Sequence, residues 1–201
     1  KCRLGVDEHE SEAFFRRFVD TVAQAGCTVF IVHARKAWLS GLSPRENRDI
    51  PPLDYGRVYR LKRAHPDLPV SINGGIASVE AAAEHLAQVD GVMMGRAAYQ
   101  EPWRLLSVDP LVFGEPAPFA SPKAALEAFL PYVEAELARG TRLHGITRHI
   151  LGLFRSVPGA RAFRRHLSTQ AVKPGAGIGV LKEAMALVMD TRPESAHIAA
   201  A

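Results

Sequence analysis

The 201-residue sequence has few cysteines and no long apolar run, and each shortage excludes a class of protein. Its two cysteines, Cys2 and Cys27, belong to no CxxC or Cys/His spacing, so we expect neither a disulfide framework nor a metal site. Few cysteines also favour a reducing compartment, and we expect a cytoplasmic protein. No apolar segment approaches the roughly 18 residues of a membrane-spanning helix, so no membrane partner is expected. With 47% hydrophobic and 23% charged residues, a disordered, collagenous or coiled-coil chain is excluded.

Acidic residues are missing from one long stretch of the sequence. Between Glu136 and Glu183 there is no Asp or Glu, yet this stretch holds nine Lys and Arg residues. The other sixteen Lys and Arg residues share the rest of the chain with all twenty-one acidic residues. A mildly acidic body thus carries a basic C-terminal segment, which points to a polyanionic partner. A merely solvated face is the plainer explanation, and the length of the acid-free stretch disfavours it.

Short apolar runs alternate with amphipathic segments in the first half of the chain. Four of these runs predict parallel strands, over residues 1–4, 28–33, 70–73 and 92–94. Helices are expected between and after them, over residues 11–24, 54–65, 79–88 and 97–105. This alternation is typical of a parallel α/β architecture. A TIM (β/α)8 barrel takes about 250 residues and eight strands, so four strands form either a different layer or half a barrel.

The second half of the chain has a helical pattern. After a proline-rich connector, apolar periodicity predicts a small bundle of helices over residues 121–138, 142–154, 159–168 and 180–189. The expected organisation is an α/β domain, a linker, a helical domain and a frayed tail, over residues 1–108, 109–122, 123–190 and 191–201.

Polar residues and glycines follow the predicted strands. Asn73-Gly74-Gly75 and Gly95-Arg96 each lie between a strand and a helix, where backbone N–H groups and an arginine suit a phosphate. The loops after the last two strands are also the usual phosphate site of TIM barrels. The alternative is a tight turn and a surface arginine.

His33 and Lys1 also lie at strand ends. Each can contact a cofactor or a substrate, although a lone histidine is more often structural.

Residues 34–53 form a long loop with basic residues around Trp38. Loops of this length within a compact domain are usually functional. Cationic groups beside an aromatic ring suit phosphate contact and base stacking, and they are Arg35, Lys36, Arg45 and Arg48. A solvated loop with Trp38 as a hydrophobic plug is the alternative.

Several segments together resemble one enzyme family. They read KCRLGVD at residues 1–7, HARKAWLSGLSPRENRDIPPL at 33–53, SINGGI at 71–76 and GVMMGRAAYQEPW at 91–103. In this order and spacing they closely resemble tRNA-dihydrouridine synthases, and the loop resembles the A subfamily. The helical segment RLHGITRHILGLFRSVPGARAFRRHLS is similar to the C-terminal domain of that subfamily. The resemblance covers about residues 1–190.

The resemblance implies an FMN-binding TIM barrel followed by a helical tRNA-binding domain. Such enzymes reduce D-loop uridines, here U20 and U20a, to 5,6-dihydrouridine with NADPH. By position, the strands would be the fifth to eighth of the barrel. The implied flavin contacts are Lys1, His33, Asn73, Gly74, Gly75, Gly95 and Arg96.

The same resemblance assigns tRNA contact to Arg45 and Arg48 of the loop, beside Arg35 and Lys36. In the basic segment, the expected tRNA contacts are on or near its helices: Arg155, Arg161, Arg164 and Arg165, with Arg148 close by. Phosphate contacts of this kind make binding sensitive to salt.

The sequence departs from the family at the catalytic cysteine. The family's proton donor lies in an Asn-x-x-x-Gly-Cys-Pro-Ser loop, which is absent, and neither cysteine of this chain matches it. We therefore expect the donor and the first half of the barrel to lie upstream of Lys1, and this fragment to be inactive and unstable alone, because half a barrel leaves open edges.

Two alternative functions stay open at this stage. One is a non-catalytic RNA-binding remnant. The other is an FMN-dependent TIM-barrel oxidoreductase acting on a small molecule, which the Arg-rich loop and the basic helices disfavour.

Overall fold

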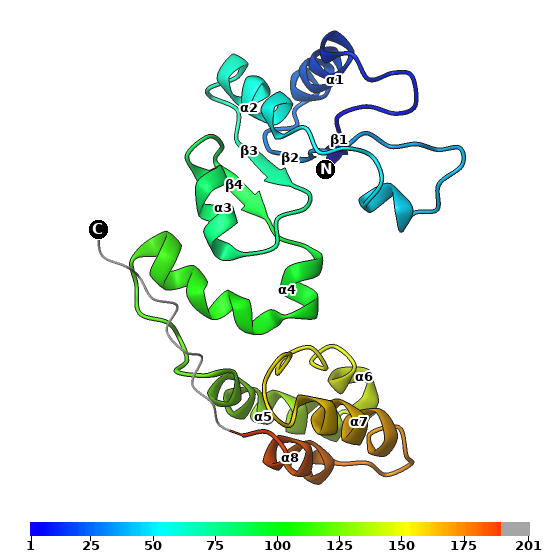
Figure 1. The fold of residues 1–201 in the computed structure, drawn as a ribbon, viewed down its shortest axis with the longest axis vertical. Helices are drawn as coiled ribbons and strands as arrows, with labels where there is room; N and C mark the ends of the chain where they lie inside the picture. Colours follow the sequence, from blue (N-terminus) through cyan, green and yellow to red (C-terminus); the bar gives the residue numbers. More distant parts are fainter. Residues whose placement is uncertain (190–201) are drawn as a thin grey trace. The chain divides into compact units, whose positions relative to one another are not determined.

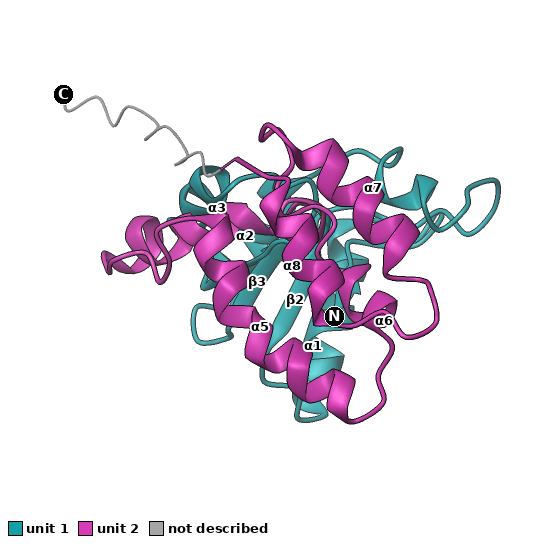
Figure 2. Cartoon of the chain, turned by 90° about the horizontal axis from the view of Figure 1, so that it is seen from below, with its two compact units in different colours: residues 1–96 teal, residues 97–201 magenta. Residues whose placement is uncertain are grey.

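The computed structural model describes residues 1–189 and divides the chain into two compact units, Lys1–Arg96 and Ala97–Ala201 (Figure 2). The division falls before the boundary after residue 108 that the sequence suggested. Trp103 explains the difference, because its side chain packs against the hydrophobic core of the second unit. The frayed tail expected over residues 191–201 lies outside the described residues.

A four-stranded parallel sheet forms the first unit (Figure 1). Its strands are β1 (Cys2–Arg3), β2 (Phe30–His33), β3 (Val70–Asn73) and β4 (Gly91–Met93), in the spatial order β1-β2-β3-β4. Every pairing is parallel. The predicted α/β class and the four parallel strands are therefore confirmed.

Three helices of the first unit begin where a side chain caps the free backbone N–H groups. They are α1 (Glu12–Gln24), α2 (Tyr55–Ala64) and α3 (Val79–Leu86). Ser11 Oγ accepts from Phe14 N at 3.1 Å before α1, and Ser78 Oγ accepts from Ala81 N at 3.1 Å before α3. Both serine caps were predicted, and Asp54 caps α2 in the same way.

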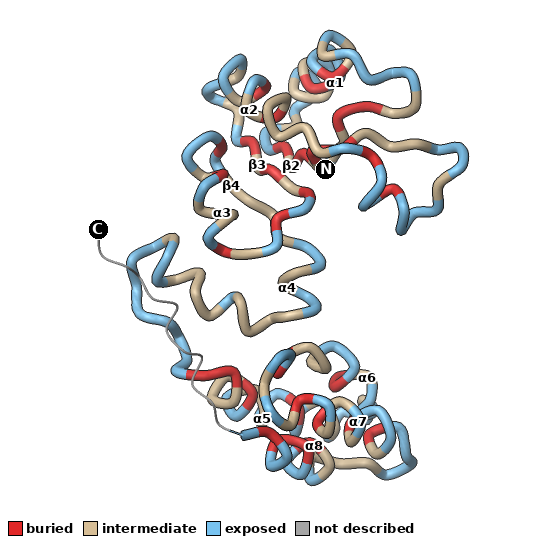
Figure 3. The backbone as a smooth tube through the Cα atoms, in the orientation of Figure 1, coloured by how far each residue is buried: buried red, intermediate tan, exposed pale blue. Residues whose placement is uncertain are grey.

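Within residues 1–96, the helices pack against one face of the sheet, and the residues of β2 and β3 alternate between buried and half-buried (Figure 3). Side chains on that face are buried against α1, α2 and α3, and they include Phe30, Val32, Val70 and Ile72. Side chains on the other face are half-buried, and they include Ile31, His33, Ser71 and Asn73. Parallel sheets are ordinarily covered on both faces. No element within residues 1–96 covers the second one.

The second unit consists of helices around a core of its own. Its elements begin with α4 (Arg96–Gln100), the 3-10 helix η2 (Pro102–Ser107) and the π-helix η3 (Asp109–Phe113). They continue with α5 (Pro122–Ala138), α6 (Leu143–Thr147), α7 (Ala160–Gln170) and α8 (Ile178–Ala186). Phe163 and Leu181, from α7 and α8, are fully buried, so the predicted bundle has a true apolar interior.

One predicted helix is much shorter than expected. Residues 142–154 were expected to be helical, but α6 ends at Thr147 and turns closed by hydrogen bonds between residues three apart follow it. At Gly152, any Cβ would overlap the carbonyl oxygen of Gln100. Further along, Ser156 has a left-handed backbone, with φ of 69°. Packing of the chain against α4 therefore overrides the helical pattern.

Candidate functional site

The carboxyl ends of the four strands form one row of side chains. Arg3 pairs with His33 in the sheet register, His33 with Asn73, and Asn73 with Met93. The row lies on the face of the sheet that no helix of this unit covers. Ligands of parallel α/β proteins bind outside this end of the strands. The structure thus brings together the predicted candidates His33 and Asn73.

His33 lies among cations, and this sets its protonation state. Burial, followed by the charges of Arg3, Arg35, Lys1 and Arg96, lowers the pKa of its imidazole to about 4. The ring is therefore neutral near pH 7 and offers one donor and one acceptor nitrogen. The surrounding positive charge favours an anionic ligand at this edge.

The pKa of His33 predicts a pH-dependent stability. The unfolded chain binds this proton near pH 6.5, whereas the folded chain binds it only near pH 4. Stability from neutral His33 is therefore complete above pH 6.5 and is lost as the pH falls toward 4. In urea titrations across this window, His33→Gln should lose less stability than the unsubstituted protein. His9→Gln, at an exposed position, is the control and should follow the unsubstituted protein; equal behaviour of both variants would contradict the prediction.

Gly74 and Gly75 make a tight turn that only glycine fits. Their φ angles are 116° and 70°, in the region that side chains rarely adopt. A Cβ at Gly74 would lie 2.6 Å from His33 Cδ2, and one at Gly75 would lie 3.0 Å from Tyr55 Oη. The Tyr55 hydroxyl donates to the Gly74 carbonyl at 2.7 Å and fixes the turn. The turn is thus tight, which is the alternative that the sequence analysis gave to a phosphate site. It also keeps a stretch of backbone free of side chains.

Asn73 and Lys1 both contact β4. Asn73 Nδ2 donates to the Met93 carbonyl at 2.7 Å, which leaves its amide oxygen without a partner among the described side chains. Lys1 Nζ lies 2.8 Å from Met93 Sδ, a weak acceptor. Burial, followed by the charge of Arg3, lowers the pKa of Lys1. Both groups therefore remain able to bind a stronger ligand.

Arg96 already has an anionic partner. Its guanidinium binds Asp49 in bidentate fashion, with 2.6 Å from Nη2 to Oδ1 and 3.0 Å from Nη1 to Oδ2. The hydrogen bond from Arg96 lowers the pKa of Asp49. A Cβ at Gly95, by contrast, would meet open space. A phosphate at this position would have to compete with the Asp49 carboxylate.

This competition yields a second prediction. Asp49→Asn should raise the affinity of the site for a phosphate-bearing ligand by about two- to five-fold, the scale of an exposed ion pair. Isothermal titration of the full-length protein with FMN measures the change. Glu80→Gln, at an exposed position without a salt bridge, is the matched control. Weaker binding by Asp49→Asn would mean that the pair positions Arg96 for the ligand instead.

The long loop of residues 34–53 is held by buried polar groups. Arg35 is only 8% exposed and donates to the carbonyls of Asp49 and Pro51. Arg3 donates to the carbonyls of Lys36 and Asn47 at 2.9 and 2.8 Å. The Arg35 guanidinium is therefore used inside the loop, and its predicted contact with tRNA stays a prediction.

Asn47 is a structural residue that the sequence analysis missed. Its buried amide binds Trp38 N and Trp38 O at 2.8 and 2.7 Å. The 3-10 helix η1 (Glu46–Arg48) places it there. Ser43 and Glu46, an S-x-x-E pair joined by a 2.6 Å hydrogen bond, were the available sequence signal.

The remaining basic residues of the loop differ in their availability. Lys36 pairs with Glu10 at 2.5 Å and lies over the Trp38 ring at 5.3 Å. Arg45 and Arg48 are exposed, and within residues 1–189 neither forms a salt bridge, since the nearby Asp49 is paired with Arg96. These two arginines are therefore the loop's free cations.

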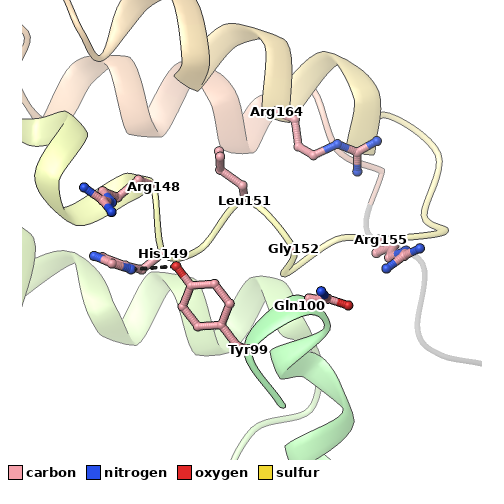
Figure 4. Close-up of a pocket in the computed structure, with 8 residues that line it drawn as sticks. All are labelled: Tyr99, Gln100, Arg148, His149, Leu151, Gly152, Arg155 and Arg164. Carbon is pink, nitrogen blue, oxygen red and sulfur yellow. Dashed lines mark hydrogen bonds between the residues drawn. The ribbon is translucent and has the colours of Figure 1, made fainter. Parts of the chain in front are cut away.

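In the second unit, three arginines surround one cavity of about 410 Å³ (Figure 4). They are Arg148, Arg155 and Arg164. Arg155 also forms a 3.1 Å ion pair with Glu101. Arg161 and Arg165 are exposed on α7. The predicted tRNA-contacting arginines of the basic segment thus lie on one helix and on the turns before it.

Residues 1–189 offer neither a candidate membrane span nor a candidate metal-binding cluster. Within this range, no helix has both the length and the apolar character needed to cross a bilayer. The same range holds no group of three or more His, Cys, Asp or Glu side chains placed to bind a metal ion.

Comparison with known proteins gives consistent matches. A protein-family model described as "Dihydrouridine synthase (Dus)" matches residues 1–187. The chain is 56% identical over 193 residues to a tRNA-dihydrouridine(20/20a) synthase of Salmonella typhimurium, covering 96% of this chain and 58% of that protein. Proteins of the same name from Yersinia pestis and Escherichia coli K12 are 55% and 56% identical, covering 97% and 96% of this chain. The chain spans 57% and 56% of those two relatives, a little over half their length.

Proposed function

The chain belongs to the dihydrouridine synthase family, and on that premise we propose that it is part of an enzyme that reduces D-loop uridines of tRNA to 5,6-dihydrouridine. The relatives are named for positions 20 and 20a, so we propose the same uridines here. We further propose FMN as the bound cofactor and NADPH as the reductant. One observation carries the proposal. The carboxyl ends of the strands form a row of side chains, which lies beside the glycine turn at Gly74 and Gly75 and among the cationic groups around His33.

We propose that residues 1–96 supply the fifth to eighth strands of a TIM barrel. The uncovered face of the parallel sheet supports this, because a further set of strands would close over it. The chain's coverage of little more than half of its relatives is consistent with it. Cys2 pairs with Val32, one position before the row of strand ends, and Cys27 precedes β2. Both side chains pack against the hydrophobic core of the first unit, and burial raises the pKa of Cys2. We therefore assign the proton donor to no residue of this chain.

The residues at the strand ends fit a flavin mononucleotide. The cradle at Gly74 and Gly75 has no room for a Cβ, and its backbone is therefore free to approach a phosphate. Gly95 leaves open space beside Arg96, whose guanidinium forks suit phosphate oxygens. Lys1, His33 and Asn73 have polar groups available for the ring system. Bound FMN would supply the hydride for uridine reduction.

The protein's own groups would then perform three tasks. The cations at the strand ends would stabilise negative charge on the cofactor. Neutral His33 would donate or accept one hydrogen bond without adding another charge. Arg35 would hold the loop in shape, so that Arg45 and Arg48 face the RNA. Lys36 would add to this surface if RNA displaced Glu10.

We propose that the arginines of the second unit bind the tRNA backbone. They are Arg155, Arg161, Arg164 and Arg165, in a stretch of sequence that contains no acidic residue. A grip on folded RNA is needed because a uridine must leave its stack to be reduced.

The test uses the full-length protein and unmodified tRNA transcript, with dihydrouridine detected by mass spectrometry and affinity measured over a salt series. Charge reversal at Arg161, Arg164 and Arg165 should lower tRNA affinity at least about tenfold and reduce the salt dependence. The same reversal at Arg16, Arg17 and Arg63, three exposed arginines of the first unit, is the matched control. Flavin binding without tRNA binding would favour a small-molecule oxidoreductase. Affinity for tRNA without flavin or turnover would favour an RNA-binding remnant.

A further inference from the structure

The cavity of the second unit is lined by both cationic and apolar side chains (Figure 4). Arg148 lies on one side, whereas Arg164 and Arg155 lie toward the other. Between them, Tyr99 and Leu151 supply an aromatic ring and an apolar side chain. The volume of about 410 Å³ lies within the range of small-ligand sites. The cavity thus offers a ligand an aromatic ring and an apolar side chain between cationic groups.

The cavity is firmly built. Gly152 packs so closely on α4 that any Cβ would overlap the Gln100 carbonyl, which fixes α4 against the turns after α6. Tyr99 Oη and His149 Nδ1 are 2.9 Å apart, and the two rings meet edge to face at 70°. The Tyr99 hydroxyl is therefore occupied, yet the residue remains 58% exposed. Its position is fixed, and much of its surface stays open.

The charge in the cavity is only partly balanced. Arg155 has Glu101 as a partner, and Glu101 also binds Arg104. For Arg148 and Arg164, no ion pair exists within residues 1–189. Guanidinium groups bind phosphate oxygens through two parallel hydrogen bonds. Two unpaired arginines around one cavity therefore favour a ligand with more than one anionic group.

We propose that this cavity binds one unstacked nucleotide of an RNA strand, with its base against Tyr99 and its two flanking phosphates on Arg148 and Arg164. The proposal rests on the proposed tRNA function and gives it a defined contact. A nucleotide within a strand is flanked by a 5′ phosphate and a 3′ phosphate. These two phosphates match Arg148 and Arg164, which lie on either side of the Tyr99 ring. Aromatic platforms beside cations bind single-stranded bases with little sequence preference. An acidic peptide would engage the arginines but would not need Tyr99.

The test measures tRNA affinity of the full-length protein over a salt series. Tyr99→Ala should weaken binding by about five- to one-hundred-fold, the range of base–aromatic stacking, without changing the salt dependence. Tyr99→Phe should lose much less affinity than Tyr99→Ala, because the ring remains although its hydrogen bond to His149 is lost. Arg148→Gln and Arg164→Gln should each reduce the salt slope by about one, as expected for a lost phosphate contact. Arg16→Gln, an exposed arginine of α1, is the control for charge alone.

Two further readouts keep the result interpretable. A benzophenone amino acid at position 99 should crosslink to one nucleotide of the tRNA, and circular dichroism should show that Tyr99→Ala remains folded. Unchanged affinity of Tyr99→Ala would overturn the nucleotide site, and so would crosslinks scattered along the RNA. If only the arginine variants weaken binding, the cavity binds phosphate or an acidic partner without a base. If the unsubstituted protein fails to bind tRNA, the proposed function falls as well.

Discussion

Gly74→Ala in the full-length protein should reduce FMN affinity by about a hundredfold or more. A residue with φ of 116° is strained unless it is glycine, at a cost of about 1–3 kcal/mol. The new Cβ would also lie 2.6 Å from His33 Cδ2 and 3.1 Å from Leu53 Cδ2. His33 would have to move, and the turn would lose the backbone surface proposed for the phosphate. Flavin absorbance of the purified protein and a titration of the apoprotein with FMN measure the effect.

Gly26→Ala provides the matched control for this experiment. Gly26 has φ of 99°, and a Cβ there would meet nothing within 4 Å. Both substitutions therefore impose a similar backbone strain, but only Gly74→Ala adds a clash beside His33. If the two variants retained equal amounts of FMN, the turn after β3 would not belong to the flavin site.

The elements that the sequence predicted well are those with a local cause. β3 occupies Val70–Asn73, as expected, because its β-branched and apolar residues are bounded by Pro69 and a Gly-Gly turn. α1 and α3 begin after Ser11 and Ser78, whose hydroxyls cap the first turn through contacts within three residues. Such signals depend on neighbours in the sequence, so they can be interpreted without knowing the tertiary fold.

Errors arose where distant residues decide the local structure. The apolar pattern of residues 142–154 is helical, but the close contact between Gly152 and Gln100 stops the helix after Thr147. Distant contacts also decide which arginine of the loop is buried, and no local pattern distinguishes Arg35 from Arg45 in this respect. The first is buried by hydrogen bonds to carbonyls fourteen and sixteen residues away, and the second is exposed.

For the candidate site, the sequence predicted which residues lie at the strand ends but not which side chains form hydrogen bonds with them. Parallel strands have their carboxyl ends at one edge, and this alone predicts that His33 and Asn73 lie together, as the sheet register confirms. The partners of the site are side chains from other segments. The hydrogen bonds between Arg96 and Asp49 and between Tyr55 and Gly74 join residues that are 47 and 19 positions apart, and no sequence motif predicts either pair.

Gly159→Ala should strongly destabilise the helical unit, by about 3 kcal/mol or more. Gly159 precedes α7 with φ of 89°, and left-handed backbone costs a side-chain-bearing residue about 1–2 kcal/mol. A Cβ there would also overlap the Leu187 carbonyl and lie 2.9 Å from Val188 Cα. Since these are backbone atoms just after α8, relief requires that α7 and α8 separate around Phe163 and Leu181. Overpacking of this kind adds a further 1–3 kcal/mol or so.

Hydrogen exchange followed by mass spectrometry locates the loss within the full-length protein. Peptides from α7 and α8 should exchange faster in Gly159→Ala, whereas peptides from β2 and β3 should keep their protection. Gly140→Ala is the control, because Gly140 has the same φ of 89° and a Cβ there would meet nothing within 4 Å. Its cost should be the backbone strain alone. Under the proposed roles, Gly159→Ala should lose tRNA affinity and keep FMN, because the proposed flavin contacts all lie in the first unit. Loss of both ligands together would show that the two units do not fold independently.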